Sequence, residues 1–156
     1  MIVLGIDPGF GSLGYGVLSF ENGNPHAVDC GCVKTPPTDV FPARLERIYT
    51  CIADLIKKHH PARIAIEKIF FEKNTKTAID VAQARGVILL AAYRAAVPIV
   101  ECTPLQVKLA ATGYGKADKR QVQQMMKLLL KQQNLPTQDD AADALAIAYC
   151  GASMAE

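Results

Sequence analysis

Acidic residues stand at the boundaries of apolar segments that are far apart in this chain. Asp7 and Glu67 each follow a short run of apolar residues, whereas Asp140 and Asp143 open a third apolar segment. Carboxylates that gather without basic partners repel one another, and a divalent cation bound by their oxygens removes that repulsion. The pattern therefore indicates a metal site, and it favours metal-dependent chemistry on phosphodiesters.

The spacing of these acids permits one shared site but leaves one ligand open. Ligands of α/β sheets gather beyond the carboxyl ends of the strands, so Asp7 and Glu67 meet if their strands are adjacent and parallel. On a helix Asp140 and Asp143 lie about 60° apart, and Asp139 and Asp143 lie about 40° apart. Spacing alone therefore does not choose between Asp139 and Asp140.

Each acid also has a purely structural interpretation. Thr137 and Asp140 match a helix capping box, and acids in a first helical turn interact favourably with the helix dipole. Asp7 could stabilise its Gly-rich turn, and Glu67 could lie at a wet strand end. One shared site explains the separate segments with a single cause, and we favour it for that reason.

The elements that must position these acids follow from hydrophobic spacing and from turn residues. The order is β-β-β-α-β-α-β-α-α-α, which predicts a mixed α/β sheet with helices on its faces. We expect strands at 1–7, 14–20, 26–34, 63–67 and 97–102, and helices at 43–58, 75–95, from about 103–104, 117–133 and 138–152. We expect residues 1–156 to form a single domain.

Composition fits an intracellular globular protein. Half of the 156 residues are hydrophobic, yet no run approaches the roughly 18 apolar residues of a membrane span. The chain starts directly in a strand pattern without a basic leader, so we expect no secretory signal. The five cysteines are scattered and lack zinc-site spacing, which favours reduced thiols.

Charge is distributed unevenly. The net charge is −1 over residues 1–67, +7 over 68–133 and −4 over 134–156. A basic middle segment suits binding of a polyanion, and an acidic end suits binding of cations near it. Solvated helix faces alone can produce the same asymmetry.

Several motifs resemble the RuvC family of Holliday-junction resolvases, and the match spans nearly the whole chain. They are Gly5-Ile6-Asp7-Pro8-Gly9, Ile66-Glu67 with Phe70 downstream, Gln83-Ala84-Arg85-Gly86, and the segment from Asp140 to Ala148. The resemblance implies an RNase H-like fold with a five-stranded mixed sheet and a homodimer. It also implies a Mg²⁺ or Mn²⁺ site made by Asp7, Glu67, Asp140 and Asp143, so that Asp140 rather than Asp139 matches the family motif.

The activity implied by this resemblance is the cutting of four-way DNA junctions during recombination and repair. Paired hydrolysis of phosphodiesters would leave a 5′-phosphate and a 3′-hydroxyl, with two ions per active site and Asp7 as the bridging ligand. The family further implies a bacterial, cytoplasmic protein that cooperates with the RuvA and RuvB branch-migration machinery and has no membrane partner.

Basic and aromatic residues are the candidates for DNA contact. Residues 103–133 hold six basic side chains against one acid, and such side chains neutralise phosphates. We favour Lys108, Lys116, Lys119 and Arg120; a solvated face is equally compatible with Lys127 and Lys131. Phe70 alone would fit a core, but the resembled family places an aromatic here against bases near the crossover.

Three other functions compete. Residues 9–14 match the dinucleotide fingerprint G-x-G-x-x-G, but that motif should open a helix and Tyr15 to Phe20 has a strand pattern. An actin-like or sugar-kinase-like ATPase needs two related domains, for which the chain leaves little room. A non-catalytic DNA-binding protein would explain the basic middle but not the acids. We assign no catalytic histidine.

Overall fold

The computed structural model describes residues 1–68, 75–131 and 139–154. Its sheet has five strands in the order β3-β2-β1-β4-β5. The first three strands pair antiparallel and the last two continue the sheet parallel to β1, which confirms the predicted mixed sheet. The strands are β1 (Ile2–Asp7), β2 (Ser12–Glu21), β3 (Asn24–Lys34), β4 (Arg63–Glu67) and β5 (Ile99–Cys102).

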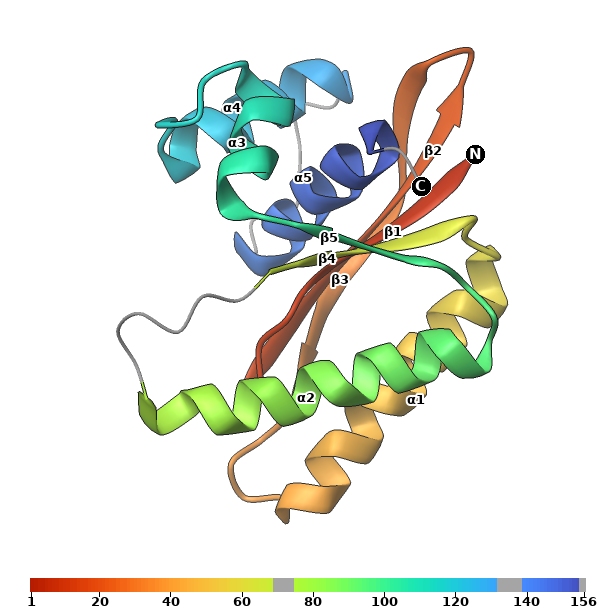
Figure 1. The fold of residues 1–156 in the computed structure, drawn as a ribbon, viewed down its shortest axis with the longest axis vertical. Helices are drawn as coiled ribbons and strands as arrows, with labels where there is room; N and C mark the ends of the chain where they lie inside the picture. Colours follow the sequence, from red (N-terminus) through yellow and green to blue (C-terminus); the bar gives the residue numbers. More distant parts are fainter. Residues whose placement is uncertain (69–74, 132–138, 155–156) are drawn as a thin grey trace.

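Helices cover both faces of this sheet (Figure 1). On one face α5 lies against the strands, and α3 and α4 pack on α5. The other face is covered by α1 and α2, which contact each other. The helices are α1 (Phe41–His59), α2 (Thr75–Arg94), α3 (Pro104–Thr112), α4 (Lys119–Leu129) and α5 (Asp139–Ser153).

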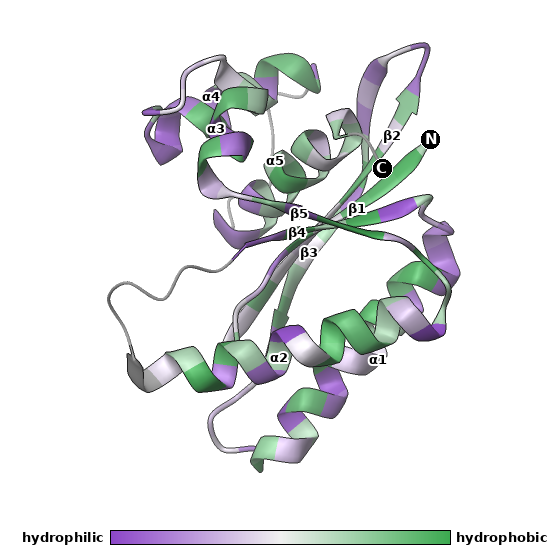
Figure 2. Ribbon diagram, viewed as in Figure 1, coloured by the Kyte–Doolittle hydropathy of each residue, from purple (hydrophilic) through white to green (hydrophobic). Residues whose placement is uncertain are grey.

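Alternation along the strands divides the core into two clusters. Leu4 and Ile6 of β1 are fully buried with Ile48 of α1, whereas Val3 of the same strand is buried with Leu145 of α5. Successive side chains of a strand point to opposite faces, so a strand with helices on both sides buries nearly every position. The resulting apolar central strands are visible in Figure 2.

Most element boundaries agree with the sequence, and the differences have local causes. Thr103 caps α3 in a capping box with Gln106, as its sequence predicts. β2 begins at Ser12 rather than at residue 14, because Ser12 already pairs with Lys34. α4 begins after a capping box built on Asp118, later than residue 117. It ends at Leu129 rather than at residue 133, because Lys131 adopts a left-handed backbone with φ of 52°.

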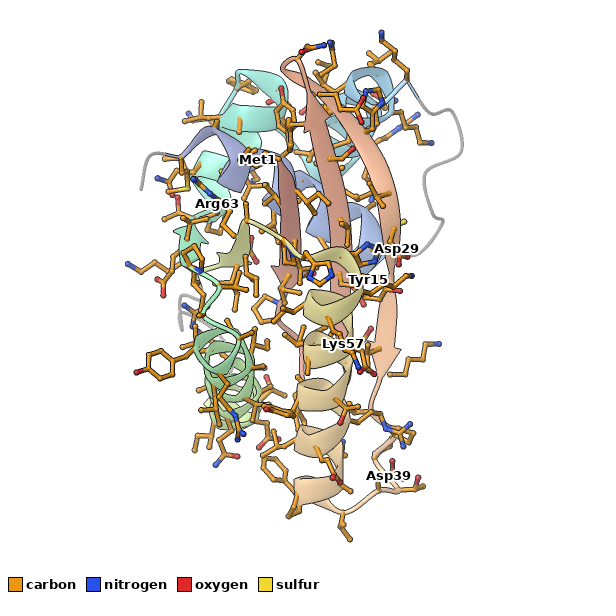
Figure 3. All side chains as sticks on the ribbon, turned by 90° about the vertical axis from the view of Figure 1, so that its right-hand side faces the viewer. Met1, Tyr15, Asp29, Asp39, Lys57 and Arg63 are labelled. Atoms are coloured by element: carbon orange, nitrogen blue, oxygen red, sulfur yellow. The ribbon has the colours of Figure 1, made fainter. Side chains whose placement is uncertain are left out.

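Polar contacts of Arg63 and Asp29, both labelled in Figure 3, tie α5 and α1 to the sheet. Arg63 at the start of β4 donates hydrogen bonds to the carbonyl oxygens of Gly151 and Met154 near the end of α5. Asp29 of β3 accepts hydrogen bonds from Lys58, at 2.7 Å, and from His59, at 2.9 Å, near the end of α1. Within the described ranges, no helix is both long and apolar enough to cross a membrane.

Candidate active site

Asp7 and Glu67 end two neighbouring parallel strands. Ile6 pairs with Ile66 in the β1–β4 ladder, so each acid directly follows the last residue that pairs between these two strands. Side-chain alternation puts both acids on the sheet face that α5 covers, because Leu4, Ile6, Ile64 and Ile66 point toward α1 and α2. β1 and β4 are adjacent and parallel, which is the condition under which the sequence lets Asp7 and Glu67 share a site.

The first turn of α5 lies directly over the neighbouring strand β2. Gly14, which pairs with Asp7 in the sheet, lies so close to α5 that an added Cβ atom would be 2.2 Å from the carbonyl oxygen of Asp140. A Cβ on Gly5 would likewise lie 2.1 Å from the carbonyl oxygen of Ala144. Glycine at these positions allows the helix backbone to approach the sheet and brings Asp140 next to the strand end that carries Asp7.

The three aspartates of α5 differ in their surroundings. Asp140 accepts a hydrogen bond of 2.6 Å from Ser12 Oγ. Asp143 lines a cavity of about 230 Å³ together with Asp7 and Glu67. Asp139 is more exposed and accepts a hydrogen bond of 3.3 Å from Gln123. Asp143 therefore shares the cavity with Asp7 and Glu67, and the charge of Asp140 also acts on Asp7, whereas Asp139 is exposed to solvent.

The acids disturb one another electrostatically. Burial raises the pKa of Asp7 to about 7, and the negative charges of Glu67, Asp143 and Asp140 add to this rise. Burial also raises the pKa of Glu67, again with a contribution from Asp143. A buried carboxylate beside other carboxylates is costly to ionise, and a bound cation reverses that cost.

The donor set fits a hard divalent cation. Each of the four side chains offers carboxylate oxygens, the ligands that Mg²⁺ prefers in proteins. Over residues 1–68, 75–131 and 139–154, no three Asp, Glu, His or Cys side chains are arranged to hold an ion as they stand. Positive charge beside the acids comes from Lys119, whose Nζ lies 2.9 Å from Asp143 Oδ2 and 3.5 Å from Asp139 Oδ2. It also comes from Lys108, whose charge acts on Glu67.

The candidate DNA-binding residues divide into two groups. Lys108 of α3 and Lys119 of α4 line the acidic cavity. Lys116 and Arg120 are exposed and lie outside its lining. Phe70 belongs to residues 69–74, outside the described part of the chain.

Two contacts at the site were not foreseen from the sequence. Ser12 Oγ orients Asp140, and its place at the start of β2 was assigned to a turn. Arg85 of α2 donates a hydrogen bond of 3.0 Å to the backbone oxygen of Glu67. Arg85 belongs to a motif that the sequence analysis singled out, but no local pattern points to a partner on another element.

Comparison with known proteins shows the family of this chain. The family profile described as "Crossover junction endodeoxyribonuclease RuvC" matches residues 3–151. The chain belongs to the RuvC family of crossover junction endodeoxyribonucleases. RuvC of Rubrobacter xylanophilus is 50% identical over 151 residues, which are 97% of this chain and 84% of that protein. The resemblance inferred from the motifs is confirmed, and the chain is an enzyme that acts on DNA.

Solved RuvC structures share the fold. The structure of Thermus thermophilus RuvC superposes with a TM-score of 0.92 at 35% identity, covering 97% of this chain and 93% of that one. T. thermophilus RuvC in complex with Holliday junction substrate gives a TM-score of 0.89 at 33% identity, with the same coverage. The predicted RNase H-like class is confirmed. The dinucleotide-binding alternative is wrong, since Tyr15 to Phe20 lies in β2 rather than in a helix.

Proposed function

We propose that Asp7, Glu67, Asp140 and Asp143 hold the divalent cations with which this RuvC chain hydrolyses DNA. The observation that carries the proposal is the partly buried Asp7 carboxyl, which lines one cavity with Glu67 of β4 and Asp143 of α5 and whose pKa rises to about 7. Such a group is stabilised in its ionised form by a cation bound among its neighbours. Mg²⁺ and Mn²⁺ are the ions that suit an all-oxygen ligand set.

Two ions per site, with Asp7 as their shared ligand, fit the order of the strands. β1 lies between β4 and β2 in the sheet, so Asp7 has Glu67 on one side and the Gly14–Asp140 contact on the other. A pair of bound ions of this kind activates water and neutralises the charge that develops on phosphate oxygens. The hydrogen bond from Ser12 fixes the orientation of Asp140 among these ligands.

The basic residues of α3 and α4 would hold the DNA backbone. Lys108 and Lys119 are placed to contact the phosphates nearest the acids, because they line the same cavity. Lys116 and Arg120 are exposed beside them and would extend the contact along the DNA. Phe70, three positions after Glu67 in the sequence, remains our candidate for stacking on a base near the crossover.

The substrate we propose is four-way junction DNA, and the product ends are a 5′-phosphate and a 3′-hydroxyl. Support comes from T. thermophilus RuvC, which has been solved with a Holliday junction substrate and matches 97% of this chain. We expect the enzyme to act in the bacterial cytoplasm together with RuvA and RuvB. Residues 1–156 would act as one nuclease domain.

A homodimer would place two such sites on one junction and permit paired nicks. The outer face of α2 supports self-association, because Ile79, Leu90 and Tyr93 are 68%, 51% and 83% exposed. Ile79, Gly86 and Tyr93 repeat every seven residues, the spacing of helix pairs. A Cβ on Gly86 would meet nothing within 4 Å, so this position leaves room for close approach of a second copy.

The test of the proposed site is Asp7→Asn, which keeps the shape of the side chain and removes its charge. We expect cutting of a labelled four-way junction in Mg²⁺ to fall by on the order of 10²–10³-fold, the scale of losing one key electrostatic group. Junction binding, measured by gel shift without cleavage, should stay within about threefold because the basic residues are intact. Normal cutting by Asp7→Asn at saturating Mg²⁺ would contradict the assignment.

A further inference from the structure

Arg85 holds the last peptide of β4 from the side of the sheet opposite the acidic cavity. Its Nη1 donates a 3.0 Å hydrogen bond to the carbonyl oxygen of Glu67, and its Nη2 forms an ion pair with Glu101 of β5. Glu101 pairs with Ile66 in the sheet, and Ile66 points toward α1 and α2. The guanidinium therefore bridges the ends of β4 and β5 on the sheet face that α1 and α2 cover.

We propose that Arg85 is a positioning residue that fixes the direction of the Glu67 carboxylate. A carbonyl oxygen held by a fixed guanidinium cannot turn freely, and the orientation of that peptide sets where the preceding Cα–Cβ bond points. Glu67 lies at the very end of β4, where ladder pairing runs out after its pairing with Cys102. The peptide after Glu67 is held on its N–H side, because Lys68 N–H donates a 2.8 Å hydrogen bond to the carbonyl oxygen of Cys102. Arg85 adds a second restraint on the carbonyl side of the same peptide.

The surroundings of Arg85 favour a precise contact over a loose surface pair. Its side chain is only 16% exposed, and the planar fork of arginine allows it to serve both acceptors at once. Exposed ion pairs usually contribute little because both side chains remain free to move. Burial of the guanidinium between α2 and the sheet limits that motion and makes the orientation of the Glu67 carbonyl reproducible.

This inference rests on the proposed function, because it takes Glu67 as a metal ligand. Groups that orient metal ligands through hydrogen bonds typically change metal affinity or activity by about 10–100-fold when they are removed. Arg85→Met should therefore weaken Mn²⁺ binding by DNA-free protein by about that factor. Arg85→Lys should recover part of the loss, because an ammonium can reach one acceptor but cannot bridge two.

The experiment is titration calorimetry of Mn²⁺ into the DNA-free full chain, with thermal unfolding of each variant measured alongside. Glu67→Gln is the positive control and should lose Mn²⁺ affinity at least as strongly as Arg85→Met. Arg47→Met is the control, since it removes an arginine of α1 that pairs with Asp39 in the turn before that helix, away from the acids. We expect Arg47→Met to bind Mn²⁺ within about twofold of wild type.

Each result has one meaning. Weak Mn²⁺ binding by both Glu67→Gln and Arg85→Met, with normal binding by Arg47→Met, supports the positioning role. If Arg85→Met melts earlier yet its folded form binds Mn²⁺ as wild type does, Arg85 is structural only and the inference is overturned. If Glu67→Gln itself binds Mn²⁺ normally, the proposed metal site fails, and the inference fails with it.

Discussion

The two faces of the sheet are packed in different ways. Toward α1 and α2 the strands present large side chains such as Leu4, Ile6 and Ile64, which are fully buried. Toward α5 the same strands present Gly5, Ala65 and the acids at their ends, and the helix lies close enough for its backbone to touch the glycines. Large side chains stabilise the packing of α1 and α2 on the first face. Small side chains on the second face let α5 approach the strands, so that acids of the helix and of the strand ends lie near one another.

This difference separates stability from function. Loss of volume on the α1–α2 face should weaken the fold without disturbing the acids. A change on the α5 face should alter the distance between α5 and the strand ends, and metal affinity with it. Matched variants on the two faces test this separation.

Truncation of a buried isoleucine gives the largest effect on stability. Ile48→Ala, on α1, should lower the free energy of unfolding by about 2–5 kcal/mol, because its side chain is fully buried. Its folded form should bind Mn²⁺ as wild type does. The matched variant Ile147→Ala, on α5, lies in the lining of the acidic cavity and should lose both stability and Mn²⁺ affinity. Equal Mn²⁺ affinities in the two variants would remove the distinction between the faces.

An added methyl group should push α5 away from the sheet. Gly14→Ala places a Cβ 2.2 Å from the carbonyl oxygen of Asp140, and such overpacking costs about 1–3 kcal/mol of stability. Because Asp140 moves with the helix, Mn²⁺ affinity should fall as well. The control is Gly11→Ala, whose Cβ meets nothing within 4 Å and should change neither quantity. Denaturant unfolding and metal titration of both variants check the expectation; unchanged Mn²⁺ affinity in Gly14→Ala would argue against the close-contact role.

Local sequence signals predicted the strand ends but not the contacts across the fold. Apolar runs that stop at Asp7 and Glu67 locate both acids, and the capping residue Thr103 locates the start of α3. The contact of Gly14 with Asp140 joins residues more than a hundred positions apart, and nothing in either segment announces it. Long-range packing of this kind is set by the whole fold rather than by local preference.

The ion-pair partners of side chains could not be predicted from the sequence either. Lys119 is a candidate for phosphate contact, and the structure also pairs it with Asp143 while its side chain remains 50% exposed. Its sequence neighbours suggested only a basic surface, because a lysine carries no local sign of which acid it will meet. The exposure of Lys119 leaves its ammonium accessible to a phosphate, so the proposed DNA contact is compatible with this ion pair.

The most direct test of a cation among the acids is the stability of wild type and Asp7→Asn across pH, with chelator and with Mn²⁺. The folded pKa of Asp7, about 7, lies above its ordinary value of 3.8. Between these values the folded state holds a proton that the unfolded state has lost, so metal-free wild type should lose up to about 1.4 kcal/mol per pH unit relative to Asp7→Asn as pH rises from about 4 to 7.

Mn²⁺ should restore that stability near pH 7, because it takes the place of the proton, and Asp7→Asn should gain much less from the same concentration. Calorimetric unfolding of both proteins provides the comparison. Equal stabilisation of wild type and Asp7→Asn by Mn²⁺ would contradict a metal site built on this acid.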